Sequence, residues 1–452
     1  MKKNKTPDDS KPLTLPRLVW PMMVETLLFM MLGMVDVLVM SRYDDLAASS
    51  VNTANQALSV LTIVFTVISG AGGILMTQYL GAGKRQDASR AAALSIAMQF
   101  IAGITVSIVL FVFSEPILRF IGAKDTVLAF SQQYLSVVGG FMFFQSVISA
   151  MTVIMRSHGN TMLPMLVTGG MNILNTLMDV ILVPGLFGFP RMGIYGVAFA
   201  TVFSRAAGCI VLGIVLFRRI EKPSCFRLLK PFPKKDVVSF FKVGIPAALE
   251  TFLYNLSQLV ITSIVLNCLT ENELIAKTYI QMITVFFYIF SVSIGQASQI
   301  IIGHLVGADK TDEAYRQGVR SHKAALIIAV SASAAGILLR VPLISIFTYD
   351  ADVIGIASVV LIINLLLEFG RTTNLVLIAC LRGAGDVYYP TICAVVSNWL
   401  ISVLGTYLLA VVCGFGIYGL WLALALDECL RGVLMMIRWH GGKWKTKKLT
   451  NA

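Results

Sequence analysis

Twelve apolar stretches of about 20 residues or more follow one another along this chain, separated by polar loops. Their approximate limits are 14–41, 52–80, 91–114, 131–155, 162–186, 193–217, 239–266, 276–305, 320–347, 354–381, 391–413 and 416–437. A stretch of this length crosses the ~30 Å hydrocarbon core of a bilayer as a helix. Lipid offers no partners to exposed backbone groups, so such segments fold as helices. The sequence predicts an all-α polytopic membrane protein with twelve transmembrane helices.

The composition excludes a soluble globular protein, since 57% of the 452 residues are hydrophobic and only 13% are charged. The first thirteen residues, MKKNKTPDDSKPL, contain no apolar run followed by a cleavage site. We therefore expect no removable signal peptide. The seven cysteines are scattered without metal-ligand spacing, so we expect neither a metal cluster nor a disulfide framework.

The net charge of +12 comes mainly from the segments that would lie on one side of the membrane. Lysine and arginine gather in both tails and in alternate loops, at 84–90, 218–242 and 310–323. The other loops hold few bases, each close to an acid. This pattern follows the positive-inside rule and predicts that both termini are cytoplasmic. Nucleic-acid binding is not expected from such a distribution.

The two halves of the chain resemble each other. LGAGKRQDASR at 80–90 matches VGADKTDEAYR at 306–316, an offset of 226 residues. The same register, within a few residues, relates further pairs: Pro21 with Pro246, Glu25 with Glu250, Arg156 with Arg382, and GIYG at 193 with GIYG at 416. The repeat predicts two pseudo-symmetric six-helix lobes around a central cavity, as in transporters that work by alternating access. The alternative is that duplication only builds a large bundle.

The basic segment around 217–237 contains three prolines and is interpreted as the connection between the lobes. The predicted parts are a cytoplasmic tail (1–13), an N-terminal lobe (14–217), a basic linker (218–238), a C-terminal lobe (239–437) and a basic cytoplasmic tail (438–452).

Acidic residues inside the apolar stretches are the main functional signal. Glu25 and Asp36 lie in the first stretch, and Asn172, Asn175 and Asp179 follow one helical face of the fifth. Ionisable groups at this depth are costly and usually serve ions, protons or substrates. Two carboxylates brought together there cannot both remain charged, so the pair could store a proton or a sodium ion. The alternative is that these side chains only hydrogen-bond neighbouring helices.

Taken together, the twelve helices, the LGAG and VGAD loops and LRGAGDVYYP at 381–390 resemble the multidrug and toxic compound extrusion (MATE) family of cation-coupled antiporters. The likeness covers residues 14–437. In bacterial and archaeal members, it implies a site for H+ or Na+ at Asp36, Asn175, Asp179 and Thr201, which would be metal ligands if the ion is Na+. It also implies a bending role for Pro21, although this proline could instead belong to the helix start.

The C-terminal lobe is less clearly assigned. Glu250 resembles a helix-7 glutamate that binds sodium in one branch of the family. Glu368 and Arg371, three residues apart, either neutralise each other as an ion pair or contribute to an ion or substrate site. Asp36 and Asp179 have no acidic counterparts in the second half, which favours an ion switch in the N-terminal lobe.

The predicted function is secondary active export of amphipathic, cationic organic compounds in exchange for H+ or Na+, by a monomer in the cytoplasmic (inner) membrane of a prokaryote. A lipid-linked oligosaccharide flippase is the alternative, but it needs a cationic cavity, and Arg205, Arg371 and Arg431 are the basic candidates in the spans. A lipid-modifying enzyme would need a nucleophile or metal cluster that we do not find. No phosphate-binding loop or other cofactor motif occurs, so the expected partners are organic substrates and the bilayer.

Overall fold

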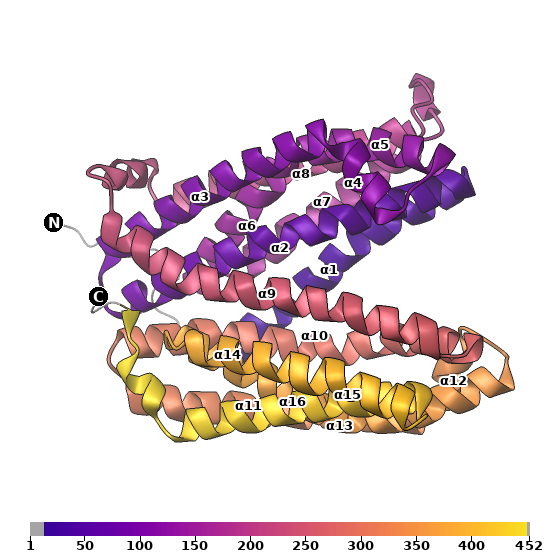
Figure 1. Ribbon diagram of the computed structural model, residues 1–452. Helices are drawn as coiled ribbons and strands as arrows, with labels where there is room; N and C mark the ends of the chain where they lie inside the picture. The colour runs from indigo at the N-terminus through magenta and orange to yellow at the C-terminus, as the bar shows by residue number, and fades with distance from the viewer. Residues whose placement is uncertain (1–12, 450–452) are drawn as a thin grey trace. The chain divides into compact units, whose positions relative to one another are not determined.

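The computed structural model describes residues 13–449, and helices joined by short loops make up this part of the chain, without a strand (Figure 1). The helices are α1 (Leu15–Ser41), α2 (Asp45–Gly81), α3 (Arg85–Val112), α4 (Ser114–Ile121), α5 (Asp125–Gly140), α6 (Met142–Ser157), α7 (Met162–Leu182), α8 (Ile194–Arg219), α9 (Lys234–Cys268), α10 (Glu271–Gly307), α11 (Thr311–Leu338), α12 (Arg340–Ser345), α13 (Ala351–Gly383), α14 (Tyr388–Ser397), α15 (Leu404–Thr406) and α16 (Gly416–His440). The predicted N-terminal tail (1–13), apart from Leu13, lies outside the described residues, as do the last three residues of the predicted C-terminal tail.

Within residues 13–449, ten helical segments are long and apolar enough to cross a membrane. One of them runs from Tyr388 to Val412. It consists of α14, a π-helical stretch (Asn398–Val403), α15 and a second π-helical stretch (Tyr407–Val412). The pair α5 and α6, bent by 47°, makes an eleventh span. The predicted twelfth span corresponds to α16, which is 25 residues long but carries Asp427, Glu428 and Arg431 near its middle. These charges pair with one another inside the protein, as described below.

The helices confirm the internal repeat found in the sequence. Helices α2 and α10 both have 37 residues and begin at Asp45 and Glu271. Helices α3 and α11 both have 28 residues and begin at Arg85 and Thr311. Both pairs keep the offset of 226 residues. The duplication therefore extends from short motifs to whole helices.

The chain forms two compact units. Unit 1 comprises the residues up to Met76 and Lys84–Gly244, and unit 2 comprises Thr77–Gly83 and the residues from Ile245 onward. The boundaries fall inside helices, because the end of α2 belongs to unit 2 and the beginning of α9 belongs to unit 1. The basic segment predicted as a linker packs within unit 1.

Contacts between α3 and the basic segment show how the segment is held. The Ser89 hydroxyl donates to Glu221 at 2.7 Å, and Arg90 pairs with Asp236 at 2.5 Å. The Cys225 side chain is buried in the same segment. Part of the segment is a 3₁₀ helix, Pro223–Leu229, so it is a folded element of the unit.

Each unit has its own apolar core. In unit 1 the core includes Val51, Phe65 and Val197, and in unit 2 it includes Ile280 and Val360. Helices α10, α13 and α16 pack together in unit 2 (Figure 1). Large apolar side chains also point outward along the spans, as expected for surfaces that meet lipid acyl chains.

The end of α2 and the end of α10 approach closely in unit 2. A Cβ atom at Gly81 would overlap the carbonyl group of His304, and one at Gly307 would overlap the carbonyl group of Gln78. Gln78 and His304 are repeat equivalents, as are Gly81 and Gly307. Glycine is required at both places because any larger residue would collide with backbone.

Candidate functional site

Two buried acids of unit 1 meet, one from α1 and one from α7. Asp36 is 1% exposed and Asp179 is 0% exposed, and their carboxyl groups lie within hydrogen-bonding range of each other. Oδ2 of Asp36 accepts the Tyr134 phenol at 2.8 Å and the Thr201 hydroxyl at 3.1 Å. A carboxyl–carboxyl contact is favourable only when a proton or another cation lies between the groups.

Four acceptor oxygens at this place receive no hydrogen bond from any described residue. They are Oδ1 of Asp36, Oδ1 of Asn175 and both carboxylate oxygens of Asp179. Asn175 lies one turn before Asp179 on α7, and its amide donates to Thr201 at 3.4 Å. Buried acceptors without donors are costly, and oxygen atoms are the ligands that hard cations prefer. The arrangement can therefore hold a proton or a small cation.

The structure brings together all four residues predicted for this site, Asp36, Asn175, Asp179 and Thr201. Asn172, the third member of the predicted polar face, has a different contact. Its amide donates to the backbone carbonyl of Leu28 on α1 at 2.5 Å. The polar face of α7 thus divides into a contact that joins α7 to α1 and a group at the acid pair.

Two further residues belong to the site and were not predicted for it. Tyr134 on α5 bonds Asp36 and also reaches Oδ1 of Asn55 on α2 at 3.3 Å. Arg205 lies one turn after Thr201 on α8, close enough for its charge to act on Asp36. The spacing of Thr201 and Arg205 could have suggested the arginine. No local pattern marks Tyr134, because its role depends on how α5 packs.

Pro21 lies inside α1, six residues after the helix begins at Leu15. It is therefore not part of the helix start, where Pro16 lies instead. A proline within a helix cannot donate to the carbonyl group four residues earlier, here that of Arg17. This carbonyl accepts a hydrogen bond from Thr161 at 3.4 Å. Thr161, the residue before α7, thus supplies the hydrogen bond that the Arg17 carbonyl does not receive from Pro21.

Glu25 is separate from the acid pair. Its carboxylate forms an ion pair with Arg156 of α6 at 2.8 Å, and its side chain is 8% exposed. The repeat-equivalent residues of unit 2, Glu250 and Arg382, form the same ion pair at 2.6 Å. Glu250 also accepts a hydrogen bond from Thr391 at 2.8 Å. Each unit therefore joins its first helix to a later one by the same Glu–Arg pair.

Glu368 and Arg371 form an ion pair at 2.7 Å, which was one of the two alternatives considered for them. It belongs to a network between α13 and α16. Arg431 pairs with Asp427 at 2.5 Å and with Glu428 at 3.1 Å, and Asn374 donates to Glu428 at 2.8 Å. No hydrogen bond or ion pair joins Glu250 to Glu368 or Arg371 within the described chain, so the predicted residues of the C-terminal lobe form two groups.

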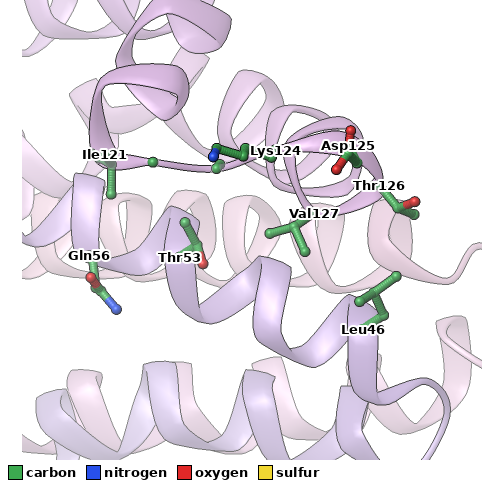
Figure 2. Close-up of a pocket in the computed structure, with 10 residues that line it drawn as sticks. Leu46, Thr53, Gln56, Ile121, Lys124, Asp125, Thr126 and Val127 are labelled. Carbon is green, nitrogen blue, oxygen red and sulfur yellow. The ribbon is translucent and has the colours of Figure 1, made fainter.

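A cavity of about 160 Å³ lies beside this network in unit 2. It is bordered by Arg371, Glu428 and Arg431 and by residues of α9 and α10. A larger, more open hollow lies in unit 1, between the first part of α2 and residues 121–127 around the loop from α4 to α5 (Figure 2). Among its lining residues only Lys124 and Asp125 are charged, and none belongs to the predicted sites.

The chain is similar to known proteins over nearly its whole length. The MatE family model matches residues 21–181 and 246–408. The chain is 34% identical to "Uncharacterized transporter YisQ" of Bacillus subtilis (strain 168), covering 98% of this chain and 97% of that one. It is 27% identical to "Probable multidrug resistance protein NorM" of Thermotoga maritima, covering 98% and 95%.

Solved structures share the fold. The Vibrio cholerae MATE transporter VcmN in the bent form aligns with a TM-score of 0.87 at 19% identity, over 97% of this chain and 96% of that chain. A crystal structure of MATE in the bent conformation aligns with a TM-score of 0.86 at 18% identity, over 94% of both chains.

Proposed function

This chain belongs to the multidrug and toxic compound extrusion (MATE) family of membrane transporters, and we propose that it is an antiporter that exports amphipathic organic cations in exchange for H+ or Na+. Relatives named as probable multidrug resistance proteins support the substrate class. The acids of unit 1 support coupling to a cation.

The observation that carries the proposal is the contact between the carboxyl groups of Asp36 and Asp179. Both are buried, and neither oxygen of Asp179 has a donor among the described residues. A charged pair without a cation would repel itself in a medium of low dielectric constant. Binding one proton or one Na+ removes this repulsion, and releasing it restores the repulsion. The site therefore has two states of different charge.

The proposed cycle links these states to α1. When a coupling ion binds, Asp36 and Asp179 attract through it, and α1 is drawn toward α7. When the ion leaves, the acids repel and can interact with a cationic substrate instead. Pro21 interrupts the hydrogen bonding of α1 between Leu15 and Asp36, so the helix can bend there without breaking a further backbone bond. We assign this bending role to Pro21.

The chain is a multi-pass membrane protein, and we place both termini in the cytoplasm. The lysines and arginines of the loops before α3, before α9 and before α11 then all face the cytoplasm, as the positive-inside rule requires. In the proposed exchange, the coupling ion enters the cell down its gradient while substrate leaves it.

The test is dye efflux driven by an imposed ion gradient. Asp36→Asn and Asp179→Asn keep the size of the side chains but remove their charge, and each should abolish coupled efflux. Glu115→Gln is the matched control, because Glu115 is an exposed acid of unit 1 paired with Arg119. Undiminished coupled efflux in both aspartate variants, at equal protein levels, contradicts the proposal. Proteoliposomes with independent pH and sodium gradients then identify the ion.

A further inference from the structure

The cavity of unit 2 occupies the place in the repeat that the acid pair occupies in unit 1. The counterparts of Asp36, Asn55 and Thr201 are Ile261, Gln281 and Leu424, and all three line this cavity. The acid of α1 and the hydroxyl of α8 have thus been replaced by apolar side chains. Unit 2 therefore keeps the cavity but not the chemistry of the ion site.

Acids do line this cavity, but each already has cationic or donor partners. Asp427 is paired with Arg431 and accepts the Ser397 hydroxyl at 2.5 Å. Glu428 is paired with Arg431 and accepts from Asn374. Additional positive charge would compete with these partners. The acids of unit 2 are consequently poor ligands for an incoming cation.

Lys277 on α10 differs from the other charged residues of the lining. Its ammonium group forms no ion pair and no side-chain hydrogen bond within residues 13–449, and the residue is partly buried. Lys277 lies near the beginning of the predicted span 276–305. A charge that is partly buried without a partner is costly, so its position against the cavity favours a ligand or counter-ion there. An anion bound here would give Lys277 the partner that every acid of the cavity already has.

The rest of the cavity lining could contact the apolar part of an organic anion whose charged group lies at Lys277. Trp421, Leu420 and Leu424 of α16 supply apolar surface. Asn398 and Ser402 belong to a π-helical stretch, a feature that often accompanies functional sites. Oδ1 of Asn398 is buried without a donor from the described chain. A volume of 160 Å³ corresponds to about five water molecules, enough for one small ring and a carboxylate.

We propose that this cavity is a second ligand site, which binds a small organic carboxylate with its charge on Lys277 and its apolar part against Trp421 and Leu424. The site is separate from the acid pair of unit 1 and does not depend on ion coupling there. It gives the protein a means to recognise an anionic or zwitterionic compound that the acids of unit 1 would repel.

The test uses two probes of similar shape and opposite charge, cyclohexanecarboxylate and cyclohexylammonium, titrated into the purified full-length protein in lipid nanodiscs. Calorimetry gives the affinity, and tryptophan fluorescence, compared with Trp421→Phe, locates the ligand. The carboxylate should bind saturably and more tightly than the ammonium compound. Lys277→Gln should weaken carboxylate binding about tenfold or more, since a charge-assisted contact is lost, whereas Lys277→Arg should largely retain it.

Two controls make the result decisive. Lys310→Gln removes a lysine that is exposed and paired with Glu313, and it should leave carboxylate binding unchanged. Asp36→Asn should also leave it unchanged, even though this variant is expected to lose coupled efflux. Equal carboxylate binding by Lys277→Gln and the unmodified protein, or preference for the ammonium probe, overturns the proposal. Such results would mean that Lys277 only extends toward the membrane surface. Melting temperatures verify that the variants are folded.

Discussion

Tyr134 donates its phenol hydrogen to the same oxygen of Asp36 that accepts the Thr201 hydroxyl, so two helices, α5 and α8, hold one carboxylate of α1. Hydrogen bonds to a charged group are worth about 1.5–3 kcal/mol each. The orientation of Asp36 toward Asp179 therefore depends on side chains outside the acid pair.

Tyr134→Phe keeps the ring but removes the hydrogen bond. We expect coupled efflux to fall about tenfold, because a loss of roughly 1.4 kcal/mol changes an equilibrium or rate tenfold. The measurement is the initial rate of dye efflux at matched protein levels. Tyr195→Phe, on an exposed position of α8, is the control and should have no effect. Equal reductions in both variants would exclude a specific role of the Tyr134 hydroxyl.

The two Glu–Arg pairs predict unequal losses of stability. The Glu25 side chain is 8% exposed, whereas that of Glu250 is 17% exposed and has Thr391 as a second partner. Removing one partner of a buried pair costs about 3–5 kcal/mol, because the other charge stays buried. Glu25→Gln should therefore lower the melting temperature more than Glu250→Gln, and Arg156→Gln should partly rescue Glu25→Gln. Independent, additive effects of Glu25→Gln and Arg156→Gln would argue against the pair.

The contact between the ends of α2 and α10 predicts that glycine is essential there. Gly81→Ala would place a methyl group against the carbonyl of His304, which cannot move without shifting α10. We expect little folded protein in detergent, as judged by size-exclusion chromatography. Gly70→Ala, in the same helix but with open space around it, should express normally. A monodisperse Gly81→Ala protein with unchanged melting temperature would contradict this packing.

Glu221, which follows α8, predicts a pH-dependent effect outside the membrane spans. Burial raises the pKa of Glu221 above its usual range, and the hydrogen bond from Ser89 opposes this only in part. Ionisation is thus harder in the folded state, so stability is highest below the unfolded pKa of about 4.3 and falls as the pH rises through the folded pKa.

Glu221→Gln should accordingly melt roughly 1–2 °C higher than the unmodified protein at pH 8, and the difference should shrink toward pH 4.5. Glu115→Gln on the exposed surface provides the baseline. A stabilisation that is independent of pH would mean that ionisation of Glu221 is not its cause.

Sequence patterns predicted the helices, the repeat and three residues of the acid site, Asp36, Asn175 and Asp179, because each leaves a local signal. Thr201 was placed in the site only by the resemblance to the family. Apolar length marks a span, and an acid within one is rare enough to be noticed. The ion pair of Glu368 and Arg371 was predictable for the same reason, since three residues separate partners on one helical face.

Contacts that depend on tertiary packing were not predictable. Tyr134 reaches Asp36 across 98 positions of sequence, and nothing near it distinguishes this tyrosine from others at membrane depth. Arg156 was recognised as a repeated residue, but its pairing with Glu25 requires knowing that α1 and α6 are neighbours. The charged network of α16 was likewise not foreseen. Its pairs within α16, Arg431 with Asp427 and with Glu428, have helical spacings that the sequence could have shown. The contacts of Glu428 with Asn374 and Arg371, in contrast, depend on packing with α13.

The assignment of Thr77–Gly83 to unit 2 and of Lys234–Gly244 to unit 1 means that neither half of the gene encodes a complete folding unit. A cut in the basic segment near residue 230 would separate each unit from a piece that it needs, as in an exchange of elements between two domain-swapped subunits. The two fragments should fold only when produced together. The two halves of this duplicated transporter therefore depend on each other for folding.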